Sequence, residues 1–206
     1  MKKNILLVTF VALFAISGTA LGQRRTGPGG MGQGTLRFHL DTSVLEHRYD
    51  LRAERSDHLH LFWADAPYLG FGFGGAVIDN LFLGARTTLG FRDNDPDEAN
   101  PGDNYQVQFG FMPYIEYMFW PTDWLSPFVT AQLGVEGWHG PQSSNWNFKT
   151  GAGGGLHFFL IPQFSMDLTG YLNYHGGHHR VEKPRAKRTP NHDLSTTVMF
   201  GLSGWL

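Results

Sequence analysis

The stretch from Gly151 to Tyr174 constrains the fold most, because it alternates apolar and other residues on both sides of a tight break at 161–163. Before the break, Leu156, Phe158 and Leu160 alternate with Gly155 and His157. After it, one side is apolar and the other polar: Phe164, Met166, Leu168, Leu172 and Tyr174 against Ser165, Asp167, Thr169 and Asn173. Successive side chains of a strand point to opposite faces, so this pattern predicts an antiparallel hairpin. Its apolar face belongs either in a soluble core or, in a membrane barrel, against lipid.

The N-terminus has the three-part pattern of a secretory signal peptide. Basic residues at 2 and 3 precede an apolar run over 5–16, which is followed by small residues up to Gly22. The alternative is a membrane anchor, but the apolar run is shorter than the about 20 residues that a spanning helix needs. We expect a signal peptide over 1–22, a flexible lead-in over 23–33 and one barrel domain over 34–206.

Cysteine is absent from the chain, so an exported domain of this size would hold together without disulfides. This excludes a small disulfide scaffold and a lipoprotein anchor, and it leaves a large sheet or barrel. The formal net charge of -2 gives no indication of a nucleic-acid partner.

Eight alternating runs follow the lead-in, over 35–44, 68–78, 81–91, 105–119, 128–138, 151–160, 164–174 and 194–206. Between the first two runs, Glu46–Asp65 is charged and is expected to form a loop or strand extensions above a membrane. The other long connections are expected over 92–104, 139–147 and 175–192. Long and short connections alternate, as in outer-membrane barrels with long extracellular loops and short periplasmic turns. The sequence therefore predicts an all-β fold, an eight-stranded antiparallel up-and-down transmembrane β-barrel.

A soluble lipocalin-type barrel is the alternative to this membrane barrel. It would turn faces rich in Gln, Glu, Arg and Asp outward, and the abundant glycine, 27 residues, would leave that surface bare. Glycine at alternate positions over 70–75 instead leaves room inside a narrow barrel. The same segment matches a G-x-G-x-x-G dinucleotide fingerprint, but another strand follows where the fingerprint needs a helix. We expect the apolar faces, including Phe109 and Leu133, to face lipid.

The chain resembles the small eight-stranded outer-membrane barrels, the OmpA-transmembrane-like and opacity-type porin fold. The resemblance rests on the segments 127–134 (PFVTAQLG), 150–155 (TGAGGG) and 164–168 (FSMDL), together with the Ile-Pro turn. It implies an outer-membrane location, contact with lipid and lipopolysaccharide, and insertion by the barrel-assembly machinery as a monomer. Members of this family include anchors, adhesins, narrow pores and enzymes, so the resemblance leaves the function open.

Seven charged residues fall on the face expected to line the lumen: Arg37, Asp41, Arg86, Glu116, Glu136, Lys149 and Asp167. Side chains can fill the interior of an eight-stranded barrel, and buried charges need partners. We expect these groups to form a paired network that plugs the lumen. The alternative is a gated polar path for small solutes.

The remaining candidate residues lie in predicted loops. The last long loop carries five cations that either contact lipopolysaccharide phosphates or remain solvated: Arg180, Lys183, Arg185, Lys187 and Arg188. Histidine spacing alone does not define a metal site, so we expect His58, His60 and the cluster His175–His179 to be exposed loop residues. No metal and no other cofactor is expected.

Two function classes follow from these residues. The first is a structural or surface-interaction protein with a plugged polar lumen and charged extracellular loops. The alternative is a small porin-like channel for ions or small solutes. A lipid-modifying enzyme of this fold carries a His-x-Ser-Asn motif, and none of the ten histidines has serine two residues on. We therefore expect no enzyme activity, although a pair assembled across strands would leave no local motif.

Overall fold

The computed structural model describes residues 31–51, 55–61, 68–93, 105–119, 121–140, 143–181 and 187–206. The predicted signal peptide over 1–22 lies outside these residues, and so does most of the predicted lead-in. The described residues form nine strands: β1 (Leu36–Asp50), β2 (Arg55–Leu61), β3 (Tyr68–Ile78), β4 (Leu81–Asp93), β5 (Tyr105–Met118), β6 (Leu125–His139), β7 (Ser143–Ile161), β8 (Phe164–Val181) and β9 (Lys187–Trp205). None of the described segments is a helix long and apolar enough to cross a membrane.

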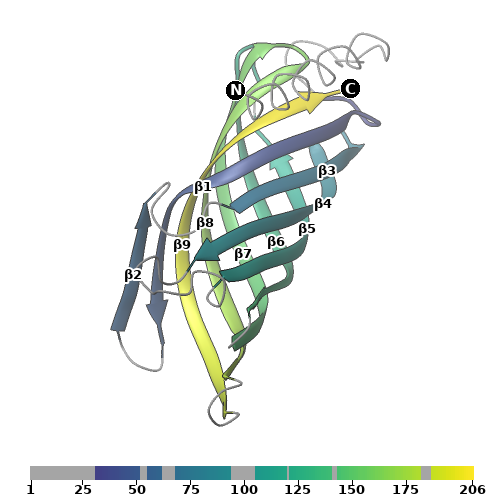
Figure 1. Cartoon of the computed structure of the whole chain (residues 1–206). Coiled ribbons are helices and arrows are strands. Elements are labelled where there is room, and N and C mark those ends of the chain that lie inside the picture. The colour runs from purple at the N-terminus through teal and green to yellow at the C-terminus, as the bar shows by residue number, and fades with distance from the viewer. Residues whose placement is uncertain are drawn as a thin grey trace, which may run out of the picture.

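Eight of these strands form one closed antiparallel barrel in the order β1, β3, β4, β5, β6, β7, β8, β9. The barrel closes where β1 pairs with β9, from Arg37 opposite Trp205 to Asp50 opposite Asp193. Figure 1 shows the tilted strands wrapping around a common axis, with the C-terminus at one end of the barrel. Closure leaves no long unpaired edge, which is the condition for a sheet to exist in lipid. The predicted eight-stranded barrel is confirmed.

Tight turns connect the strands at the end of the barrel where the C-terminus lies. Asp79 and Asn80 link β3 to β4, and Asn80 has a φ of 65°, a left-handed conformation that asparagine tolerates. Pro162 and Gln163 link β7 to β8. We call this the turn end of the barrel and the opposite one the outer end.

At the outer end, β1 leaves β3 and takes β2 as its partner. The pairing with β3 ends at Thr42 opposite Leu69, and the pairing with β2 starts at Leu45 opposite Leu61. β2 therefore pairs with the same edge of β1 as β3 does, but farther toward the outer end. Figure 1 shows β2 beside the outer part of β1. For Glu46–Asp65 we expected either a loop or strand extensions. The described residues of this range form strand extensions.

The last strands are longer than the sequence indicated. β8 continues to Val181 and β9 begins at Lys187, so the predicted loop over 175–192 is wrong for all but its central residues, 182–186, which lie outside the described part of the chain. Likewise β7 begins at Ser143, within the predicted loop over 139–147. Glycine, histidine and charged residues are poor strand formers on average, but backbone pairing with long neighbouring strands outweighs that preference.

Apolar and polar residues occupy opposite faces of the barrel wall. On β6 the outward Leu133 is 56% exposed, whereas the inward Gln132 and Glu136 are 5% and 1% exposed. Phe109 on β5 is likewise 43% exposed. The outside is therefore apolar and the inside polar, which is the arrangement of a transmembrane barrel and the reverse of a soluble one.

An apolar cluster fills the turn end of the lumen: Met31, Ala76, Phe82, Met118, Phe128, Phe159 and Trp205. Met31 is held there by its backbone, since its N–H donates to Asn80 Oδ1 at 3.0 Å and its carbonyl accepts from the Asn80 N–H at 3.0 Å. The Gln33 N–H donates to Asp79 Oδ1 at 3.0 Å. Residues 31–33 thus belong to the barrel end, and here the structure differs from the predicted boundary of the lead-in.

The orientation of the wall predicts the cost of placing charge on its outer face. Replacing Leu133→Arg in the middle of β6 should lower the free energy of unfolding by about 2–4 kcal/mol, because the guanidinium would lie in hydrocarbon. Leu160→Arg, next to the turn end and equally outward, is the matched control and should cost about 0–1 kcal/mol. Denaturant titration in lipid vesicles measures both, and equal costs would contradict the placement of the apolar band.

Candidate functional site in the barrel lumen

The seven charged residues singled out in the sequence all lie inside the barrel. They come from six strands, and none is more than 8% exposed: Arg37, Asp41, Arg86, Glu116, Glu136, Lys149 and Asp167. Their ion pairs form three groups along the lumen.

The first group, the turn-end cluster, consists of Arg37, Glu116, His157 and Asp167. Arg37 forms a salt bridge with Glu116. His157 lies between two carboxylates, with Nδ1 2.7 Å from Asp167 Oδ1 and Nε2 3.2 Å from Glu116 Oε1. Ionised carboxylates only accept hydrogen bonds, so an imidazolium ring, which donates from both nitrogens, satisfies both contacts of His157. Two cations therefore balance two anions.

Aromatic rings and hydroxyl groups surround the turn-end cluster. The Arg37 guanidinium lies 5.3 Å from the centre of the Trp205 ring and 5.4 Å from that of Tyr114, within range of cation–π attraction. His157 stacks on Phe128 with ring centres 4.2 Å apart. Asp167 also accepts hydrogen bonds from Ser165, at 2.8 Å, and from Ser203. The cluster is thereby joined to the apolar cluster beneath it.

The second group is an ion pair between neighbouring parts of the wall. Arg86 donates from Nε and Nη2 to Asp41 Oδ1, at 3.1 and 2.5 Å. His39 Nε2 lies 3.4 Å from Asp41 Oδ2. The His39 ring occupies the space above Gly72, where a Cβ would lie 1.8 Å from the ring. Glycine at this position of β3 is thus required by the close approach of a lumen side chain.

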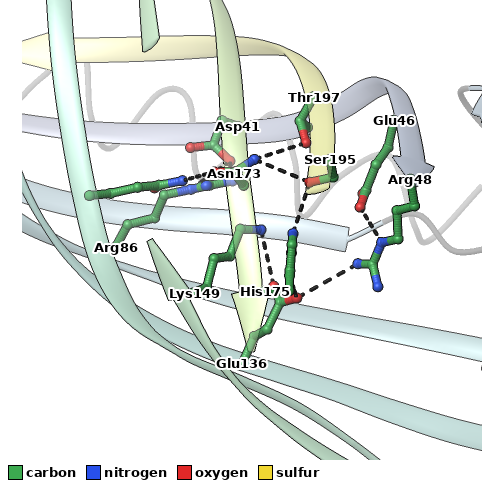
Figure 2. Close-up of polar contacts among 11 residues, drawn as sticks. Asp41, Glu46, Arg48, Arg86, Glu136, Lys149, Asn173, His175, Ser195 and Thr197 are labelled. Atoms are coloured by element: carbon green, nitrogen blue, oxygen red, sulfur yellow. Dashed lines mark hydrogen bonds and ion pairs between the residues drawn. The ribbon is translucent and has the colours of Figure 1, made fainter. Parts of the chain in front are cut away.

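The third group, the outer-end cluster, is centred on Glu136 and also contains Glu46, Arg48, Lys149 and His175 (Figure 2). Lys149 Nζ donates to Glu136 Oε2 at 3.0 Å, and His175 Nδ1 lies 2.7 Å from Glu136 Oε1. Arg48 Nη2 lies 3.7 Å from the same oxygen, while its Nε donates to Glu46 Oε1 at 2.7 Å. In this cluster, the cations Lys149 and Arg48 face the anions Glu136 and Glu46.

Uncharged side chains connect the outer-end cluster with the adjoining wall. Gln132 Nε2 donates to Asn173 Oδ1 at 3.0 Å. Asn173 Nδ2 in turn donates to Thr197 Oγ1 at 3.2 Å and lies 3.5 Å from Ser195 Oγ. Ser195 Oγ is also 2.8 Å from His175 Nε2. The inner face of β8 and β9 therefore carries a continuous chain of hydrogen bonds.

Sequence reasoning missed Glu46 and Arg48 of the outer-end cluster and two histidines. His157 alternates with glycines on the polar side of its run, which places it inward, but no sequence pattern connects it with Glu116. His175 was expected to be an exposed loop residue, and that prediction is wrong, because it is 0% exposed. The alternation of Asp167, Asn173 and His175 on one face of β8 is the signal that could have placed it.

The other predicted site residues lie at or beyond the edge of the described structure. Arg180, on β8, is opposite Arg188 on β9, and Lys187 is opposite Val181, at the outer end of the two strands. Their side chains are not among the described ones, and Lys183 and Arg185 lie outside the described residues. The side chains of His58 and His60 on β2 are also not among the described ones. Within the described residues, no group of three or more His, Cys, Asp or Glu side chains is arranged to hold a metal ion.

Comparison with known proteins identifies the fold. No protein-family model matches the chain, and no curated protein matches it. Among solved structures, it is similar to Neisserial surface protein A (TM-score 0.59, 14% identity, covering 84% of this chain and 99% of that one). It is similar to outer membrane protein AlkL in lipid bilayers (0.54, 13%, 90% and 95%) and to Ail, the attachment invasion locus protein of Yersinia pestis (0.50, 12%, 84% and 99%). The chain thus has the fold of the small eight-stranded outer-membrane barrels, as its sequence resemblance predicted.

The turn-end cluster predicts a large effect of removing one charge from the lumen. Glu116→Gln should lower the free energy of unfolding by about 3–5 kcal/mol, because Arg37 would remain buried without its carboxylate partner. The double variant Arg37→Met with Glu116→Gln leaves the His157–Asp167 pair and should cost less than Glu116→Gln alone. Denaturant titration of the refolded barrel in detergent measures both. A cost below about 1 kcal/mol for the single variant would contradict the pairing.

Proposed function

We propose that this chain is an outer-membrane barrel with a closed lumen, which acts as a structural or surface-interaction protein. The observation that carries this proposal is the closure of the turn end, where the apolar cluster and the turn-end cluster fill the bore one above the other. A barrel filled in this way serves as a rigid anchor. Its outer strand ends and loops then form the surface that meets other molecules.

The outer-membrane location is supported by three features of the chain. The outward face is apolar, with Leu133 and Phe109 among its exposed residues. The barrel is closed, so its strands leave no long edge unpaired in lipid. The N-terminal 22 residues have the pattern of an export signal. Insertion by the barrel-assembly machinery as a monomer is part of the same proposal.

Closure of the lumen is supported by the balance of its charges. The turn-end cluster pairs two cations with two anions, the Asp41–Arg86 pair is neutral, and the outer-end cluster pairs Lys149 and Arg48 with Glu136 and Glu46. Charges that are paired across the bore attract a passing ion less than unpaired charges do. They also occupy a space that is only wide enough for side chains in a barrel of eight strands.

The outer surface adds a proposed contact with lipopolysaccharide. Arg180 and Arg188 lie opposite each other at the outer ends of β8 and β9, and Lys187 is the first residue of β9. Lys183 and Arg185 fall between the two strands in the sequence. Five cations within nine residues suit phosphate groups at the membrane surface, since guanidinium groups bind phosphate in a bidentate manner.

A small porin-like channel is the second candidate, and one observation favours it. Several buried polar atoms of the lumen have no hydrogen-bond partner in the structure: Thr88 Oγ1, Gln108 Oε1 and both amide atoms of Asn147. Buried polar groups without a protein partner are commonly satisfied by water. Such groups suit a hydrated path for small solutes.

Conductance separates the two candidates. The purified protein in a planar bilayer should show no stable open steps, because the turn end is filled. The double variant Phe82→Ala with Trp205→Ala removes two rings of the apolar cluster, and it should conduct if that cluster seals the bore. Stable steps in the unmodified protein that change when Glu116 or Arg86 is replaced would instead establish the channel.

Cell fractionation tests the location. The protein should be recovered with outer membranes and should migrate faster on a gel before heating than after it, as folded barrels do. Leu133→Arg, which weakens lipid contact, should reduce the folded fraction, whereas Leu160→Arg should not. Recovery as a soluble periplasmic species would overturn the proposed location.

A further inference from the structure

The outer-end cluster contains an arrangement that a closed anchor does not need: His175 joins a serine to a carboxylate (Figure 2). His175 Nε2 lies 2.8 Å from Ser195 Oγ, and His175 Nδ1 lies 2.7 Å from Glu136 Oε1. The three side chains come from β9, β8 and β6 and are at most 1% exposed. A serine, an imidazole and a carboxylate linked in this order are the components of a serine nucleophile, recognised by geometry rather than by sequence position.

The hydrogen bonds set the proton positions that such a site requires. Glu136 only accepts hydrogen bonds, so His175 must carry its proton on Nδ1. Burial disfavours the charged form of the ring, and His175 is 0% exposed, so we take it as neutral. Its Nε2 lone pair then points at the Ser195 hydroxyl, which donates to it. Glu136 thereby acts as a positioning residue that fixes the tautomer of the base.

The other inward serines of the described chain lack this partner. Ser165 and Ser203 both donate to Asp167, and the hydroxyl of Ser126 has no hydrogen-bond partner. None of these hydroxyls is hydrogen-bonded to an imidazole that could take its proton during attack. The arrangement at Ser195 is thus specific, and it provides matched controls in the same lumen.

We propose that Ser195 is an activated nucleophile that hydrolyses small carboxylic esters. Ser195 Oγ attacks the carbonyl carbon as its proton passes to His175 Nε2. The tetrahedral intermediate then collapses, and the alcohol leaves with that proton. Water hydrolyses the acyl-serine in the same way, giving its proton to His175 and releasing the carboxylic acid, and the proton returns to Ser195. Asn173 Nδ2, 3.5 Å from Ser195 Oγ, is the donor placed to stabilise the oxyanion.

The position of Ser195 along the bore gives the substrate a route from outside. Ser195 is opposite Arg48 in the pairing of β1 with β9, near the outer end of β1 and midway along β9. The Arg48 side chain is 20% exposed, whereas that of Glu136 below it is 1% exposed. The site therefore lies beside the partly exposed Arg48 side chain and away from the filled turn end. A substrate that enters past Arg48 needs no path through the barrel, and the narrow bore limits it to a small ester.

This inference departs from the expectation of no enzyme activity that the missing His-x-Ser motif suggested. In this chain the base and the nucleophile lie on adjacent strands, 20 residues apart in sequence. A pair assembled across two strands leaves no short sequence motif.

Labelling with diisopropyl fluorophosphate tests the nucleophile. The folded, full-length protein in detergent should acquire one phosphoryl adduct, and peptide mass spectrometry should locate it on Ser195 and not on Ser126 or Ser203. His175→Gln should slow the labelling by at least roughly 100-fold, because the general base is lost. Ser126→Ala is the matched control and should label at the unmodified rate. The heat-dependent gel shift confirms that each variant is folded.

Hydrolysis of p-nitrophenyl acetate provides a second readout. The unmodified protein should release nitrophenol, and Ser195→Ala should reduce the rate to that of buffer, while Ser203→Ala should retain it. If His175→Gln does not fold, the selectivity for Ser195 over Ser126 and Ser203 within the unmodified protein decides the matter. Absence of an adduct on Ser195 in folded protein, or labelling of Ser195 at the rate of the other serines, would overturn the proposal. Either result leaves the conductance test of the closed barrel unaffected.

Discussion

The pairing of β1 with β9 is the constraint on which the rest of the structure depends. Once the sheet closes, alternate side chains must point into a bore that is only wide enough for side chains. Polar and charged groups in that bore leave bulk water, and each must find a partner or incur a large desolvation cost. The three groups of paired charges and the hydrogen-bonded chain on β8 and β9 follow from that requirement. The apolar outer face follows from the same alternation.

Buried polar groups are paired in different ways at the two ends of the lumen. At the turn end, Arg37 and His157 neutralise Glu116 and Asp167 beneath aromatic rings, and an apolar cluster that includes Met31 fills the remaining space. At the outer end, Glu136 has three nitrogen-bearing partners and uncharged side chains take part. A filled turn end is suited to an anchor. A hydrogen-bonded outer end also leaves one hydroxyl, that of Ser195, directed at a base.

The alternation of residues predicted the number of strands, the faces and the tight turns, because these depend only on neighbours in sequence. The ends of β7, β8 and β9 could not be predicted in the same way. His175 and its neighbouring glycines have a loop-like composition, and only pairing with a long adjacent strand keeps them extended. Met31 was likewise assigned to a flexible lead-in, since its hydrogen bonds with Asn80 connect distant parts of the chain.

The candidate site was predictable as a set of inward charges but not as a set of partners. Which carboxylate meets which cation depends on the register of several strands around the barrel, and period-two patterns carry no information on register between strands. The connection of His157 with both Glu116 and Asp167 is one such case. The Ser195–His175–Glu136 arrangement is another, because it requires three strands in their native register.

Nitrogen-15 NMR of the His157 ring in the folded barrel tests the central claim, that buried charges are paired throughout the lumen. The paired structure predicts that both ring nitrogens of His157 carry a proton at neutral pH, with each N–H directed at a carboxylate. The shifts of His157 should then be those of an imidazolium, unlike those of His175, which should be a neutral ring protonated on Nδ1. A neutral His157, with one unprotonated ring nitrogen, would contradict the account.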